Sequence, residues 1–135
     1  MPHDQRNLSE EYLSIEELHK ACHAPGVCGE KMDCEGEIAR VKGYIDYDNV
    51  FDREHYPQLP YEKFKIHDMK GESIEVWVLS DHNKEIFQRI YQNKVSGEKT
   101  AFIKGLLAGF DMPVMGRCRR GISVSIKKAS DIFFQ

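Results

Sequence analysis

The chain has 135 residues and a net charge of −3, with 41% hydrophobic and 30% charged residues. A chain of this length fits one domain that buries about two thirds of its unfolded surface, so a core is available without covalent cross-links. The composition excludes a disordered or fibrous protein, and no apolar run approaches the roughly 20 residues of a membrane-spanning helix. Residues 97–135 carry 7 basic and 3 acidic residues and form the only anion-facing part of the sequence.

The N-terminal residues predict one helix followed by a loop. Ser14 and Glu17 have the spacing of a capping box, and apolar residues recur at helical intervals between Asn7 and His23. Glycines are frequent in the residues that follow, as in a connecting loop. We therefore expect residues 1–34 to be an appendage of a main domain that spans residues 35–135.

The main domain begins where the apolar period changes from helical to every second residue, which is the pattern of half-buried strands. Five strands are expected. They are Ile38–Asp46, Lys63–His67, Ser73–Leu79, about Thr100–Ala108, and Gly121–Lys127.

A second helix is expected between the third and fourth of these strands. Ser80 or Asp81 can cap it, and it carries an apolar stripe and ends before Gly97. The segments 47–60 and 109–120 are rich in turn-forming residues, so both are expected to be loops.

Strand, strand, strand, helix, strand, strand is the order of the OB fold, a partly open five-stranded β-barrel. Gly43 and Gly105 suit the strand bends that close such a barrel. The stretch from Ile103 to Ile132 resembles the last two strands of OB domains of the tRNA-anticodon-binding-like group. This resemblance implies a mainly β protein: an OB-type barrel with a helix between strands three and four, plus an N-terminal helix.

Members of that group often bind nucleic acid, so the resemblance implies a non-catalytic module that binds single-stranded nucleic acid. OB domains hold such ligands on the face of strands two and three and on adjoining loops, where bases stack on aromatic rings and cations contact phosphates. Asp46 and Glu75 lie on the same expected face and would repel phosphates. The candidate binding residues are Lys42, Tyr44, Phe51, Lys65, Trp77, Arg117, Arg119 and Arg120.

A second interpretation stays open. Trp77 and Tyr44 would pack beneath the N-terminal helix, and the chain would be a structural or protein-interaction domain of an exported bacterial protein of periplasmic or lipoprotein type. The sequence does not choose between a cytoplasmic protein and an exported one whose signal was removed. The expected partners are thus single-stranded nucleic acid or a protein.

The four cysteines allow a disulfide, a zinc site or free thiols. Cys22, Cys28 and Cys34 are spaced by five intervening residues and form no Cys-x-x-Cys knuckle, so we expect no metal. A bridge between two of them would staple the loop that connects the helix to the barrel. The sequence contains no nucleophile motif and no glycine-rich phosphate loop, so we expect neither a catalytic residue nor a cofactor.

Overall fold

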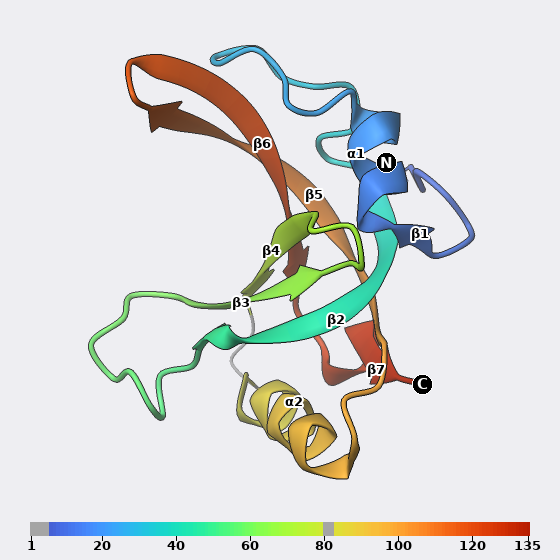
Figure 1. The fold of residues 1–135 in the computed structure, drawn as a ribbon, viewed down its shortest axis with the longest axis vertical. Helices are drawn as coiled ribbons and strands as arrows, with labels where there is room; N and C mark the ends of the chain where they lie inside the picture. The colour runs from blue at the N-terminus through green and yellow to red at the C-terminus, as the bar shows by residue number, and fades with distance from the viewer. Residues whose placement is uncertain (1–5, 80–82) are drawn as a thin grey trace, which may run out of the picture.

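The computed structural model describes residues 6–79 and 83–135 (Figure 1). Its seven strands form one mixed sheet, and the order of elements is that of a mainly β protein. The strands are β1 (Leu13–Ser14), β2 (Ile38–Phe51), β3 (Glu62–His67), β4 (Ser73–Val78), β5 (Ala101–Val114), β6 (Arg117–Ile126) and β7 (Ile132–Phe134). The helices are α1 (Ile15–Cys22), α2 (Asn83–Ser96) and the short 3₁₀ helix η1 (Ala129–Asp131).

Five of the strands close into a ring. The pairing runs β2–β3–β4–β6–β5, and β5 also pairs with β2. Within the ring β4 and β6 are parallel and the other pairs are antiparallel. The short strands β1 and β7 are added at β2 and β5. In sequence order β4 and β5 are the third and fourth of the five ring strands, and helix α2 lies between them in the chain.

The interior of the ring is the hydrophobic core, and the expected alternation along the strands is confirmed. Phe64 and Ile66 on β3, like Val76 on β4, are fully buried, while the residues between them reach the surface. At Gly105 a Cβ atom would collide with the carbonyl oxygen of Ser125. Glycine at that position therefore lets β5 and β6 approach closely.

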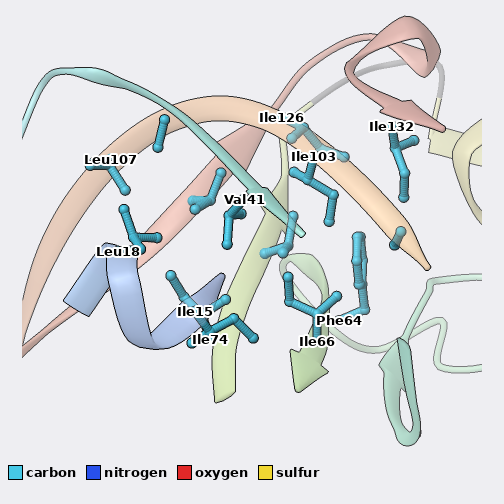
Figure 2. Close-up of a cluster of buried hydrophobic side chains, with 14 of the residues drawn as sticks. Ile15, Leu18, Val41, Phe64, Ile66, Ile74, Ile103, Leu107, Ile126 and Ile132 are labelled. Carbon is cyan, nitrogen blue, oxygen red and sulfur yellow. The ribbon is translucent and has the colours of Figure 1, made fainter. Parts of the chain in front are cut away.

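The two helices lie at opposite ends of the ring (Figure 1). Helix α2 places Phe87 edge-on against Phe64, with their ring centroids 6.3 Å apart. Helix α1 buries Ile15 and Leu18 completely, and Figure 2 shows both side chains pointing toward Val41 and the rest of the core. Both helices thus share one hydrophobic cluster with the strands.

The N-terminal helix is shorter than predicted. The capping box at Ser14 and Glu17 is confirmed, with both of its hydrogen bonds present, and it fixes the helix start at Ile15 rather than near Asn7. Residues ahead of it are extended: Asn7 pairs with Ile38, and β1 pairs with β2. The candidate caps of the second helix, Ser80 and Asp81, lie outside the described residues.

The two predicted loops were wrong in part. Strand β2 continues through residues 47–51, and its pairing with β3 shifts in register between Asp46 and Val50. The strand continues because the Val50 side chain is buried in the core. The segment 109–120 is mostly strand: β5 and β6 stay paired as far as Val114 and Arg117. Side chains in this extension are largely exposed, so they lack the apolar alternation by which strands are predicted.

Two disulfides fasten residues 22–34 to the rest of the molecule. Cys22 is bonded to Cys34, and Cys28 is bonded to Cys118 on β6, with Cα atoms 5.3 Å and 5.9 Å apart. The structure thereby selects the disulfide among the three alternatives for the cysteines. In the described ranges, no helix has the length and apolar character needed to cross a membrane.

Candidate ligand-binding groove

The outer face of β2, β3 and β4 carries polar and aromatic side chains in cross-strand rows. Alternate residues of a strand point to the same face, and paired residues of neighbouring strands lie side by side. The register therefore brings together residues that are far apart in the sequence. The three rows are Phe51–Lys63–Trp77, Asp46–Lys65–Glu75 and Tyr44–His67–Ser73.

An aromatic cluster lies at one end of this face. The rings of Tyr61 and Trp77 have centroids 4.7 Å apart and are tilted by 50°. The Lys63 ammonium lies 5.4 Å from the Tyr61 centroid and 5.3 Å from that of Trp77, within the range of a cation–π interaction. Lys63 also pairs with Glu75 at 3.0 Å. Trp77 is only half-buried, so part of its ring is available to a ligand.

Two hollows of about 310 Å³ and 490 Å³ meet on this face and share Lys65 and Glu75 as lining residues. We call the two together the groove. Its first half is bounded by the aromatic cluster and the end of β2, and its second half by α1 and the β5–β6 hairpin. Apolar lining residues include Phe51, Leu59 and Tyr61 in the first half, and Pro25, Phe110 and Met112 in the second.

Three carboxylates line the groove, and each is paired within the protein. Glu75 pairs with Lys63, Glu72 with His19 at 2.9 Å, and Glu16 with both Lys20 and Lys70. The hydrogen bonds from Lys70 and Lys20 lower the pKa of Glu16. Glu16 and Glu75, whose partners are lysines, are therefore partly neutralised where a ligand would approach.

Among the described residues, no ion pair is present for Lys65, Arg117 or Arg119, three of the predicted site residues. Lys65 lies at the centre of the groove. Arg119 is paired across the hairpin with Met112. Because paired residues share a face, Arg119 is on the same side as the groove-lining Met112. Arg117 follows two residues away on the same face.

Arg120 points the other way and is committed to internal contacts. Its guanidinium binds Glu35 through two hydrogen bonds of 2.8 Å and 2.7 Å and also pairs with Asp111 at 2.9 Å. The Glu35 carboxylate accepts further hydrogen bonds from the backbone N–H groups of Met32 and Gly109. The Arg120 hydrogen bonds hold the pKa of Glu35 at about 2, although burial opposes the shift. This cluster is structural rather than open to a ligand.

The remaining predicted residues lie nearer the margin. Lys42 pairs with Ser14 of β1 and Phe102 of β5 and lines neither hollow of the groove. Tyr44 is 37% exposed, and its ring lies 6.0 Å from that of His67. Trp77 packs against Tyr61 and Lys63, whereas α1 buries its apolar residues inside the ring.

Sequence reasoning missed most of the groove lining, including Tyr61, Lys63, Phe110 and Met112. Lys63 could have been found, since it alternates with the inward Phe64 and shares the face of Lys65. Phe110 and Met112 could not be predicted as groove residues, because their segment was expected to be a loop.

A second polar cluster connects the loop after β2 with α2. Asp52 is buried and accepts hydrogen bonds from the Tyr91 hydroxyl at 2.7 Å and from Nδ1 of His55 at 2.8 Å. Burial and the Asp52 hydrogen bond raise the pKa of Tyr91. Both carboxylate oxygens of Asp52 thus accept a hydrogen bond, which indicates an anchor for the loop. Within residues 6–79 and 83–135 no group of three or more His, Cys, Asp or Glu side chains could hold a metal ion.

The sequence matches no model of a known protein family and no curated protein. Among solved structures it is similar to the chain described as "OBody NL8 bound to hen egg-white lysozyme". The identity is 18%, the similarity covers 73% of this chain and 93% of that chain, and the TM-score is 0.49. An identity and a TM-score this low support no conclusion about function, so the function is argued from the residues of the groove.

Proposed function

We propose that the ring is an OB-type β-barrel of the tRNA-anticodon-binding-like group and that the chain is a non-catalytic binding module. The closed order β2–β3–β4–β6–β5 and the position of α2 after the third ring strand support this assignment. A five-stranded Greek-key barrel presents its second and third strands, here β3 and β4, as a ligand platform. The groove lies on that platform.

The ligand proposed for the groove is single-stranded nucleic acid. The observation that carries this proposal is the partly buried Trp77, which packs against the groove-lining residues Tyr61 and Lys63. Beside them Glu75 is paired with Lys63, whereas Lys65 has no ion pair among the described residues. A base stacked on an aromatic ring contributes about 1–3 kcal/mol and needs no particular sequence. Lys65, Arg117 and Arg119 would meet the phosphates, so binding would weaken as salt rises.

The test is a titration of a fluorescent oligonucleotide at low and moderate salt. Trp77→Ala is expected to weaken binding about tenfold, as removal of one stacking platform implies. Its thermal unfolding should change little, because the Trp77 ring lies outside the core.

Phe133→Ala is the matched control. Phe133 is 41% exposed on β7, where it stacks on Phe102 away from the groove. Oligonucleotide affinity should stay unchanged in this variant. If the unmodified protein at micromolar concentration does not bind the oligonucleotide in low salt, the nucleic-acid proposal is wrong.

A second candidate function is a protein-interaction domain of an exported protein, and the two disulfides favour it. Cys28–Cys118 and Cys22–Cys34 are expected to persist in an oxidising compartment and to be rare in the cytosol. Alkylation without reduction, followed by mass spectrometry of protein isolated from its native cells, should detect no free thiol. Four alkylated cysteines would instead place the protein in a reducing compartment.

A further inference from the structure

The β5–β6 hairpin extends beyond the ring (Figure 1). The side chains at its tip are apolar and exposed. Met115 in the turn is 97% exposed, and Val114 before it is 59% exposed. Val27 is 64% exposed and lies against the same hairpin, because its neighbour Gly26 pairs with Arg120 and its other neighbour, Cys28, is bonded to β6. A small group of apolar side chains is thus gathered at one projecting end of the molecule.

Local folding does not account for methionine at position 115. Met115 and Gly116 are the two central residues of the turn, with φ angles of 49° and 78°. Two-residue hairpin turns with positive φ at both positions favour Asn-Gly, whereas a long side chain with positive φ is uncommon. Met115 therefore neither suits its turn nor packs in the core.

Two cations flank the apolar tip. Arg117 and Arg119 are both exposed and form no ion pair among the described residues. The third arginine, Arg120, is neutralised by Glu35 and Asp111 on the reverse face. An apolar tip bordered by arginines complements a surface with anionic groups above an apolar layer.

We propose that this hairpin tip docks on an anionic lipid surface. Met115 and Val114 enter the boundary between headgroups and acyl chains, and Arg117 and Arg119 contact the lipid phosphates. A protein partner is a poorer fit, because a stable protein interface buries about 800 Å² per partner and this tip is convex and made of few side chains. A bilayer surface needs no complementary pocket. This docking goes beyond the proposed binding of a ligand in the groove.

The hairpin is held rigidly enough for such a contact. Its reverse face carries the Cys28–Cys118 disulfide and the two hydrogen bonds between Arg120 and Glu35. These links fix the direction in which the tip projects before any membrane is met. Docking therefore orders little additional chain, which favours association.

The test is co-sedimentation with vesicles of phosphatidylglycerol and phosphatidylcholine, compared with phosphatidylcholine alone. Binding to the anionic vesicles at low salt is expected. Met115→Asn should weaken it about tenfold, since it removes the apolar side chain that enters the interface. Thermal stability should be unchanged or raised, because Asn-Gly suits this turn. Arg119→Gln should weaken binding about fivefold at low salt.

Met69→Asn is the matched control, since Met69 is 86% exposed in a pocket rim beside β2 and α2, away from the hairpin. Its vesicle binding should equal that of the unmodified protein. Equal binding to both lipid compositions, or full binding by the Met115→Asn variant, would overturn the proposal. Self-association without lipid that Met115→Asn abolishes would make a second copy of the chain the occupant and also overturn it. The Trp77→Ala variant should bind vesicles as the unmodified protein does. Failure of the groove proposal can therefore be distinguished from failure of the vesicle-docking proposal.

Discussion

The ring and the hairpin extension are built from the same two strands, yet different forces hold them. Inside the ring, alternate residues of β5 and β6 such as Ile103, Leu107 and Val124 are almost completely buried in the common core. Beyond Gly109 the same strands are mostly exposed. There the Cys28–Cys118 disulfide and the Glu35–Arg120 ion pair fasten the hairpin to the preceding loop.

The difference shows what a strand pair needs when it leaves its core. Two strands alone are marginally stable in water, because hydrogen bonds between strands largely replace hydrogen bonds to water. An extension without buried apolar surface therefore requires a covalent or ionic link. The same arrangement leaves one hairpin face free for the groove and the tip. Separate substitutions can test each half of this comparison.

The largest effect is expected in the ring. Phe64→Ala removes a fully buried ring that packs edge-on against Phe87 and leaves a cavity. The free energy of unfolding should fall by about 3–5 kcal/mol in a urea titration. Tyr61→Ala is the control, because its ring is 37% exposed, and a loss below about 1 kcal/mol is expected there. Equal losses in the two variants would contradict a core confined to the ring interior.

The next effect concerns the covalent link. A variant with Cys28→Ser and Cys118→Ser opens a loop closed over a sequence separation of 90 residues. The free energy of unfolding should fall by about 2–4 kcal/mol, because the unfolded chain gains conformational entropy. Hydrogen exchange should speed up most in the hairpin beyond Gly109. Unchanged exchange there would show that the extension is held without its disulfide.

The smallest of the three concerns the ionic link. Glu35→Gln leaves the Arg120 guanidinium without its main partner, and a loss of about 2 kcal/mol at neutral pH is expected. Glu35 has a pKa of about 2 in the folded protein against an ordinary value of 4.5. A lowered folded pKa stabilises the protein above 4.5, and that stabilisation is lost as the pH falls from 4.5 toward 2.

Thermal unfolding between pH 6 and pH 2 measures this dependence. The unmodified protein should lose stability in the window below pH 4.5 more steeply than the Glu35→Gln variant, which has no carboxyl group to protonate at this position. Parallel curves would mean that Glu35 does not supply the acid sensitivity.

Much of the ring could be predicted because local sequence patterns indicate its strands. The alternation in Phe64 and Ile66, and likewise in Val76, identified strands whose inner faces are buried. The Ser14–Glu17 capping box was recognised, although the helix was predicted to begin near Asn7. These signals depend only on neighbouring residues. The groove was predicted less completely: Phe51 and Lys65 were named, but most of the lining, including Tyr61 and Phe110, was not.

The sequence by itself determined the mainly β character, the inward residues of the central strands and the presence of two helices, since periodicity and capping are local properties. Tertiary structure decided the rest. It paired Cys28 with Cys118, extended β5 and β6 past the core, and turned Arg120 inward while Arg119 stayed exposed. Each of these depends on strand register and on groups distant in the chain, which no local pattern specifies.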